Sequence, residues 1–311
     1  MTIGIVANGA NAGAAVVDAL LATELLGRGA IGGFAVFAYV DAAGEMQYLT
    51  TQQGGVSSLG LFDACLTADA AAVISSGPDR PEPLTQFLPV SRGVGFVTGH
   101  RLPNSLGTDG MPLNRAALEE MGAGQDPQSA VDRVLRNAPE LDAGLIAMNL
   151  QGQIGLGNSA RVSRRADLGI FQRVEKGRSL AFMLNSIYGL EGVTPSVTGI
   201  AGIAWSRLLG TRSQDVFVTL RQTVELKLGA QDVVHVNEHN EIQLLETANP
   251  RLLEMNRRTT VVYLGALIKR DGLAVGNSMS ELYLHVEAGT VVPSALHAQN
   301  TFLMRAGGKH D

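Results

Sequence analysis

Residues 29–51, GAIGGFAVFAYVDAAGEMQYLTT, constrain the fold more than any other stretch because they fold back on themselves. Two strand-like runs flank Asp41-Ala42-Ala43-Gly44, a turn typical of a β-hairpin. A second pair of apolar runs, within LDAGLIAMNLQGQIGLGNSARV, is hinged at Gln151-Gly152. A short hairpin loop joins antiparallel strands, so the sequence predicts antiparallel sheets.

Helical patterns alternate with these hairpins. We expect a helix from Ala14 to Leu26, two helices within residues 112–137 and another within 178–190. Residues 214–285 read as strand-rich and largely antiparallel. With 45% hydrophobic and 17% charged residues, a chain of 311 residues can bury one large core or two smaller ones. The predicted class is α/β, of the α+β kind.

A glycine-rich break, Gly9 to Gly13, follows the first apolar run, TIGIVA, and has the order of a dinucleotide-binding turn. Ala15 replaces its third glycine, and the strand that ends at Asp41 turns back as a hairpin. A dinucleotide-binding fold needs a parallel neighbour after a right-handed crossover. We therefore interpret the break as a simple strand-to-helix turn.

Charge and cysteine content exclude several classes of partner. The net charge is −5 and the sequence has no long basic run, so we expect no nucleic-acid partner. Cys65 is the only cysteine, which excludes an intrachain disulfide, and we expect it to be buried. The His235, His239 and His285 positions lack the order of a zinc motif, so we expect no metal and no cofactor. No apolar run is long enough to cross a bilayer, and we expect a cytoplasmic protein without a membrane partner.

Thr2 is the candidate nucleophile. An N-terminal threonine can attack a carbonyl when its own α-amino group, with a pKa near ~8, takes the hydroxyl proton. Removal of Met1 would expose Thr2 at the start of the TIGIVA strand.

Three stretches together resemble the N-terminal-nucleophile (Ntn) hydrolase superfamily. TIGIVA is similar to the nucleophile strand of its isoaspartyl peptidase and asparaginase branch. The stretch from Asn11 to Leu49 resembles a segment of γ-glutamyltransferase, in which an alanine-rich helix leads to a Gly-Phe strand and a hairpin. Residues 114–155 resemble the family's arrangement of helix, Asp-Pro, helix and strand-turn-strand. The resemblance implies a four-layer αββα sandwich over residues 1–190, which residues 191–311 complete or cap.

The sequence departs from this family at two points. Self-processing members place their nucleophile at the start of the strand after the helices, where this chain reads Leu141-Asp142-Ala143-Gly144. An internal autocleavage nucleophile is therefore missing. The hairpin is followed by TTQQGG rather than by an arginine that could bind a glutamyl carboxylate.

The implied activity is hydrolysis of a linear or cyclic amide bond, other than a peptide bond, in a small molecule. Thr2 would attack the carbonyl, and backbone amides at Gly32-Gly33 or Asn8 would hold the oxyanion. A comparable Arg/Asp pair binds the substrate head group in the asparaginase-like branch, so substrate contacts are expected from Ser159, Arg161, Arg164 and Asp167. Gly32-Gly33 could equally be a strand entry, and the arginines a solvated loop.

Two other functions remain open. A non-catalytic member of the same scaffold would bind a ligand or assemble as an oligomer, and we expect a homo-oligomer in either case. A ring-opening cyclic amidohydrolase is suggested by the Gly-Asn-Ser endings of residues 144–159 and 265–278. That enzyme would need Ser159 or Ser278 beside a lysine, and Lys269 is the nearest lysine in the sequence.

Overall fold

A computed structural model of the chain describes residues 2–27, 31–77, 79–187 and 192–307. The chain divides into two compact units, Met1–Arg212 and Ser213–Asp311. The boundary follows Arg212 rather than residue 190, because helix α6 (Val193–Leu209) packs on helix α1 (Ala12–Leu26). Arg207 of α6 also donates from Nε to Asp18 of α1 at 2.7 Å.

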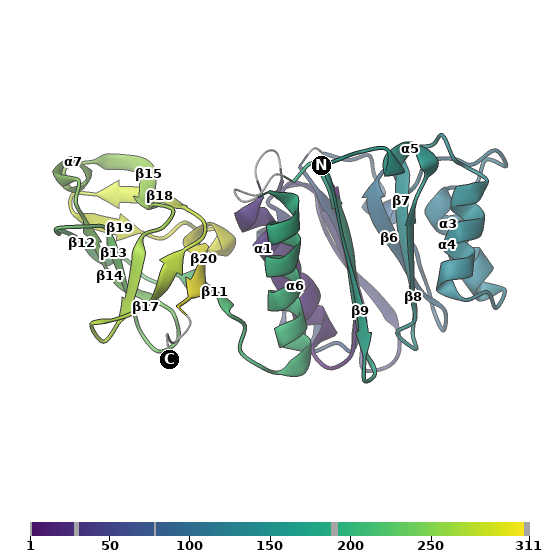
Figure 1. The fold of residues 1–311 in the computed structure, drawn as a ribbon, viewed down its shortest axis with the longest axis horizontal. Coiled ribbons are helices and arrows are strands. Elements are labelled where there is room, and N and C mark those ends of the chain that lie inside the picture. Colours follow the sequence, from purple (N-terminus) through teal and green to yellow (C-terminus); the bar gives the residue numbers. More distant parts are fainter. Residues whose placement is uncertain (1, 28–30, 78, 188–191, 308–311) are drawn as a thin grey trace. The chain divides into compact units, whose positions relative to one another are not determined.

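The first unit is a four-layer αββα sandwich, as expected (Figure 1). Helices α1 and α6 form one outer layer, and α3 and α4 form the other. The larger inner sheet is antiparallel throughout, with β1 and β4 at its centre. In spatial order its strands are β3 (Met46–Thr51), β2 (Ala35–Val40), β4 (Ala70–Ser76), β1 (Thr2–Asn8), β10 (Arg178–Asn185) and β9 (Leu168–Glu175).

The second inner sheet has four antiparallel strands. Its strands in order are β5 (Val90–Ser91), β6 (Gly95–Arg101), β7 (Ala143–Asn149) and β8 (Ile154–Asn158). Both predicted hairpins are confirmed, as β2–β3 and β7–β8.

Helices α3 (Leu113–Gly122) and α4 (Pro127–Arg136) confirm the predicted helical pair. Asp126 begins α4 by accepting hydrogen bonds from the amides of Gln128 and Ser129 at 3.1 and 3.0 Å. Pro127 occupies the first turn, where its missing N–H is not needed. Among its described residues this unit also has two short helices, α2 (Asp63–Leu66) and α5 (Ala160–Ser163), and two 3₁₀ turns, η1 (Gly55–Ser58) and η2 (Leu84–Phe87).

Apolar cores fill the spaces between the layers of the sandwich. The core between the sheets includes Val6, Ile74 and Met183 from one sheet and Phe96 and Ile146 from the other. A separate core joins the second sheet to α3 and α4. Each fully buried aliphatic side chain contributes about 1.5–3 kcal/mol, so these cores are a major source of the stability of the unit.

One helix prediction was wrong. Residues 178–185 form strand β10 rather than the start of a helix, and residues 188–190 lie outside the described residues. This strand is buried on both faces, between the inter-sheet core and α6, and its middle residues, LAFML, are therefore continuously apolar. Continuous apolar runs of this length carry no period that separates strand from helix.

The second unit is strand-rich, as predicted, and has its own apolar core. Most of its strand pairs are antiparallel, but β12–β14 and β13–β16 are parallel. No helix among the described residues is long and apolar enough to cross a membrane. The strands, in sequence order, are β11 (Asp215–Thr219), β12 (Val224–Leu228), β13 (Val233–Val236), β14 (Ile242–Thr247), β15 (Asn256–Val262), β16 (Leu267–Arg270), β17 (Leu273–Ser278), β18 (Leu282–Glu287), β19 (Thr290–Val292) and β20 (Thr301–Ala306), with the short helix α7 (Pro250–Leu253) and the turn η3 (His297–Asn300) between them.

Candidate active site

Thr2 opens a central strand of the larger sheet. It pairs with Ser76 of β4 on one side and with Asn185 of β10 on the other. Side chains alternate along a strand, so Thr2 and Gly4 lie on the same face as Val6, which packs in the core between the sheets. The Thr2 side chain therefore faces the inter-sheet space at one end of the sandwich, and the residue is 3% exposed.

Polar side chains from both sheets meet at this end. Ser76 and Asn185 share a face with the core residues Ile74 and Met183. From the opposite sheet, His100 continues the face of Phe96, and Asn158 continues the face of Ile154. We call Thr2, Ser76, His100, Asn158 and Asn185 the polar layer.

The polar layer begins where strands β1 and β6 of the two sheets touch. A Cβ added at Gly4 would lie 2.4 Å from the carbonyl oxygen of Gly99, so the β1 and β6 backbones are in direct contact. On one side of this contact the inter-sheet space holds apolar side chains, and on the other it holds the polar layer. Buried polar side chains are costly unless they are hydrogen-bonded, so their concentration at one end is typical of a functional site.

His100 is the titratable member of the polar layer. Its Nε2 lies 2.6 Å from Asn158 Oδ1, and the ring is fully buried. Because Asn158 presents an oxygen, Nε2 carries the proton and Nδ1 is an acceptor. Burial lowers the pKa of His100, an effect that the Asn158 and Asn185 side chains oppose. His100 Nδ1 and Asn185 Oδ1 are both buried acceptors, and neither has a hydrogen-bond partner among the described residues.

Gly144 makes the contact between His100 and Asn158 possible. It lies on β7 between them, paired with His100 of β6 and with Asn158 of β8. A Cβ at this position would lie 2.3 Å from His100 Nε2 and 2.3 Å from Asn158 Oδ1. Only glycine leaves room for this bond across the strand.

Two ion pairs flank the polar layer. Arg101 donates from Nε to Asp142 at 3.0 Å, and this guanidinium lowers the pKa of Asp142. Arg165 donates from Nε to Asp167 at 2.8 Å, and the Ser186 hydroxyl donates to the same carboxylate at 2.7 Å. Burial opposes ionisation of Asp167, but these bonds prevail and lower its pKa to about 2.

The backbone is unusual immediately after two members of the polar layer. Arg101 follows His100 with φ 63°, and Ser186 follows Asn185 with φ 52°. Left-handed conformations are uncommon for residues other than glycine and concentrate at functional sites. Ser186 is held by Asp167 and by Arg165, whose Nη2 donates to its hydroxyl at 3.0 Å, and it accepts a bond from Asn185 Nδ2 at 3.0 Å.

Some of the predicted site residues lie near Thr2. Gly32 lines a small cavity that Thr2 also lines. Gly33 lies beside the end of β4, but its N–H already donates to the Ser76 carbonyl at 3.0 Å, so it is not a free oxyanion donor. Asp167 is connected to the polar layer through Ser186 and Asn185.

The remaining predicted residues have other roles. Asn8 is at the opposite end of β1 from Thr2, about 20 Å away at ~3.3 Å per residue, and so cannot serve the same site. Ser159 caps α5, since its hydroxyl donates to the Leu141 carbonyl at 2.6 Å and accepts from the Val162 amide at 3.2 Å. Arg161 and Arg164 are exposed, and Arg164 pairs with Glu140 at 3.0 Å.

The serine alternative also lacks a suitable geometry. Ser278 donates to the Tyr263 carbonyl at 2.6 Å and accepts from the Ala266 amide at 2.9 Å. Lys269 lies three residues after Ala266, a separation of about 10 Å at ~3.3 Å per residue in an extended strand. Its strand partner is Ala274, not Ser278. The Ser159 and Ser278 hydroxyls are thus both engaged with backbone groups.

Four residues near this end of the sandwich, His100, Asn158, Asn185 and Glu24, were not predicted from the sequence. The first three carry no local motif, because strand register alone brings them together. A signal was nevertheless present: in GFVTGHR the histidine falls on the same alternating face as the apolar Phe96. Glu24 stands in the last turn of an alanine-rich, buried helix, where an acid is out of place.

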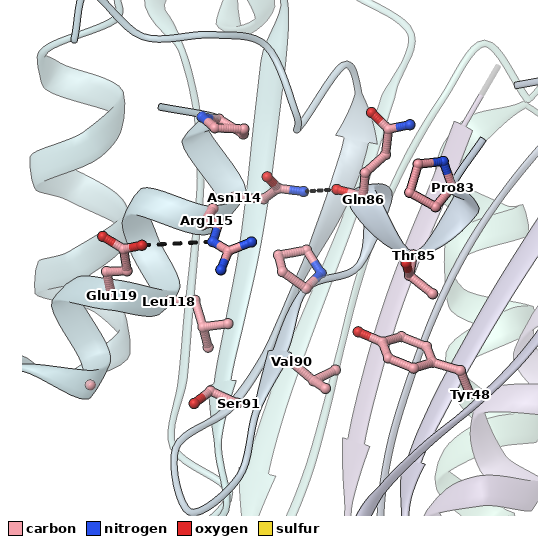
Figure 2. Close-up of a pocket in the computed structure, with 13 residues that line it drawn as sticks. Tyr48, Pro83, Thr85, Gln86, Val90, Ser91, Asn114, Arg115, Leu118 and Glu119 are labelled. Atoms are coloured by element: carbon pink, nitrogen blue, oxygen red, sulfur yellow. Dashed lines mark hydrogen bonds and ion pairs between the residues drawn. The ribbon is translucent and has the colours of Figure 1, made fainter. Parts of the chain in front are cut away.

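A larger pocket of about 590 Å³ lies elsewhere in the first unit, between η2, β5 and α3. Figure 2 shows Tyr48, Gln86, Asn114, Arg115 and Glu119 around it. Asn114 Nδ2 donates to the Gln86 backbone carbonyl at 2.8 Å, and Arg115 Nε lies 3.7 Å from Glu119 Oε1 (Figure 2). Its volume is in the range of small-molecule sites.

The chain matches two known protein families, one for each part of the sequence. Residues 2–216 match the family described as "Domain of unknown function (DUF6963)", and the chain belongs to that family. Residues 223–299 match a second one, "Domain of unknown function (DUF7259)". The two matches correspond closely to the two compact units.

Comparison with individual proteins adds little. No curated protein matches the chain. Similar solved structures include the glutamine phosphoribosylpyrophosphate (PRPP) amidotransferase from B. subtilis complexed with ADP and GMP, at 10% identity and a TM-score of 0.35 over 62% of this chain and 48% of that one. Another, described as the allosteric regulatory enzyme of purine biosynthesis, shares 9% identity at a TM-score of 0.34, with coverage of 62% and 48%. The chain spans about half the length of these structures, and likeness of this degree carries no argument about activity.

Proposed function

We propose that this chain is an amide hydrolase of the N-terminal-nucleophile type, with Thr2 as its nucleophile after Met1 is removed. The observation that carries the proposal is the polar layer. An antiparallel αββα sandwich with an apolar interior concentrates buried polar side chains at one end, and Thr2 starts a central strand at that end.

The chemistry follows from the groups at that end. The Thr2 hydroxyl oxygen attacks the amide carbonyl carbon while its proton passes to the Thr2 α-amino group. The tetrahedral intermediate collapses, the C–N bond breaks, and the amine leaves with that proton. Water then hydrolyses the Thr2 ester, which releases the acid and restores the hydroxyl. The Gly33 amide already donates to the Ser76 carbonyl, so it is not the oxyanion donor in this proposal.

The polar layer supplies the substrate contacts in this proposal. His100 is neutral near pH 7 because burial lowers its pKa. Its Nδ1 and the Asn185 Oδ1 are acceptors without a completed bond, which suits a substrate that presents an N–H donor. Arg101 and Arg165 are each paired with a carboxylate, so the proposed substrate is an uncharged amide rather than an acidic one.

Two measurements test this function. Intact mass of the purified chain must show loss of Met1, because a chain that retains Met1 has no Thr2 α-amine. A panel of small linear and cyclic amides is then screened with the wild type, Thr2→Ala, Thr2→Ser and the exposed control Thr50→Ala. We expect Thr2→Ala to lose at least 10³-fold in rate, on the order of a lost nucleophile, while Thr50→Ala keeps full activity. Equal hydrolysis by Thr2→Ala would exclude the mechanism.

A non-catalytic binding protein is the second candidate. It is favoured by the 3% exposure of Thr2 and by the volume of the cavity beside it, about 10 Å³. In that case the 590 Å³ pocket is the proposed ligand site. Two results together would establish this alternative. The purified chain would retain Met1, and ligand binding would be weakened by Asn114→Ala but unchanged by Thr2→Ala.

A further inference from the structure

A small cavity lies against the start of β1, on the side of the sheet that α1 covers. Its volume is about 10 Å³, close to the space that one water molecule needs. Thr2, Glu24, Gly32 and Ser75 are among its lining residues. Ser75 pairs with Ile3 and lies on the opposite face of the sheet from the polar layer. The cavity is thus distinct from the inter-sheet space that the Thr2 side chain faces.

Glu24 is the acid that lines this cavity. It lies in the last turn of α1, where the helix dipole is negative and disfavours a carboxylate. Its Oε1 accepts one hydrogen bond, from the Val56 amide of η1 at 3.1 Å. Glycine at position 55 makes this approach possible, because a Cβ there would lie 2.3 Å from Oε1.

Glu24 has no counter-ion in the part of the chain that the structure describes. Burial raises its pKa to about 8, opposed by the Val56 bond, and no charged side chain from α1, η1, β1 or β4 contributes. The nearby acid of the same helix, Asp18, has Arg207 as its partner. An acid held at the wrong end of a helix without a cation is a costly arrangement, and such arrangements concentrate at functional sites.

We propose that the Glu24 carboxyl is the hydrogen-bonding and ionic partner of the Thr2 α-amino group once Met1 is removed. This inference rests on the proposed function, since only removal of Met1 creates that amine. Thr2 and Glu24 line one cavity, and the new α-amine supplies a positive charge where the described residues give Glu24 no cation. Glu24 is a positioning residue: it accepts an N–H from the amine, orients the amine lone pair toward the Thr2 hydroxyl, and stabilises the ammonium that forms during attack.

The test uses a full-length chain that begins at Thr2 whether or not natural processing occurs. It is released from an N-terminal ubiquitin fusion, and its α-amine is titrated by pH-dependent acetylation with mass spectrometry of the first peptide. A carboxylate partner raises the pKa of an amine above its ordinary value near ~8. We expect Glu24→Gln to lower that pKa by about one unit or more, Glu24→Asp to retain part of the rise, and the exposed control Glu119→Gln to change nothing. Identical titrations of wild type and Glu24→Gln would overturn the inference.

A second measurement covers the case in which Glu24→Gln fails to fold. The Glu24 carboxyl is titrated by ¹³C NMR in two wild-type chains, one that begins at Met1 and one that begins at Thr2. We expect a lower Glu24 pKa in the chain that begins at Thr2, and equal values would refute the pairing. Retention of Met1 in the normally expressed protein would refute the proposed function alone, because the pairing is measured on the released chain.

Discussion

Substitution of Gly144 by alanine tests the geometry of the polar layer most directly. The added methyl group would lie 2.3 Å from the His100 ring and 2.3 Å from Asn158 Oδ1, well inside van der Waals contact. The His100 ring is fully buried, so it cannot swing out into solvent to avoid the methyl group. The bond between Nε2 and Oδ1 must therefore lengthen or break.

The expected magnitude has two parts. Overpacking of a buried site costs about 1–3 kcal/mol, and a broken hydrogen bond between buried groups adds about 1 kcal/mol. Replacement of glycine in a strand recovers about 0.5–1 kcal/mol of conformational entropy. We expect a net loss of about 1–3 kcal/mol in the free energy of unfolding of the first unit.

Trp205 makes the assay specific to that unit. It is the only tryptophan, is buried, and lies in α6 of the first unit. Urea unfolding followed by its fluorescence thus reports on the αββα sandwich separately from the second unit. The control is Gly122→Ala at the end of α3, where the nearest atom to an added Cβ is 3.8 Å away. A Gly144→Ala protein within about 0.5 kcal/mol of wild type would refute the described contact of His100, Gly144 and Asn158.

Three further predictions concern charged groups, with Trp205 fluorescence as the measurement. Burial lowers the pKa of His100, so the unfolded chain binds more protons than the folded chain. The free energy of unfolding of the wild type should therefore decrease as the pH falls below about 6.5, and that of His100→Gln should depend less on pH. In a chain that keeps Met1, the raised pKa of Glu24 makes the folded state bind more protons between 4.5 and about 8. Glu24→Gln should therefore gain stability over wild type as the pH rises through that range, and a constant difference would contradict the raised pKa. The pKa of Asp167 is lowered from 3.8 to about 2, so its carboxylate stabilises the fold above pH 3.8, and this stabilisation is lost as the pH falls toward 2. Asp167→Asn should reduce the free energy of unfolding by about 1–3 kcal/mol at pH 7 and should remove the loss of stability between pH 3.8 and 2.

The fold could be predicted from local signals where those signals were strong. Asp41 to Gly44 marked a hairpin, and Asp126-Pro127 marked a helix start, so these elements followed from short stretches. The order of the layers was implied by the resemblance to the Ntn hydrolase superfamily. Strand β10 was misread because burial on both faces removes the alternation that identifies a strand. Strand β10 was therefore mispredicted because of its burial, not because its residues have an unusual secondary-structure propensity.

The candidate site could be predicted only in part. Thr2 was identified because its chemistry depends on chain position, and it remains a prediction. Asn8 was assigned to the same site from its nearness in sequence, although a strand separates residues by its full length. His100, Asn158 and Asn185 come together through the register of two different sheets, which no single stretch of sequence encodes. Their common property, a polar residue on an otherwise apolar strand face, becomes informative only once the pairing is known.

The contact between Gly4 and Gly99 sets a limit on what this end of the sandwich can receive. With the two backbones touching there, the space around Thr2 is closed toward the apolar core. A ligand that reached Thr2 between the sheets would meet this contact two residues further along β1. A substrate of the proposed hydrolase would therefore present a terminal group to Thr2, because β1 and β6 leave no gap at Gly4 and Gly99.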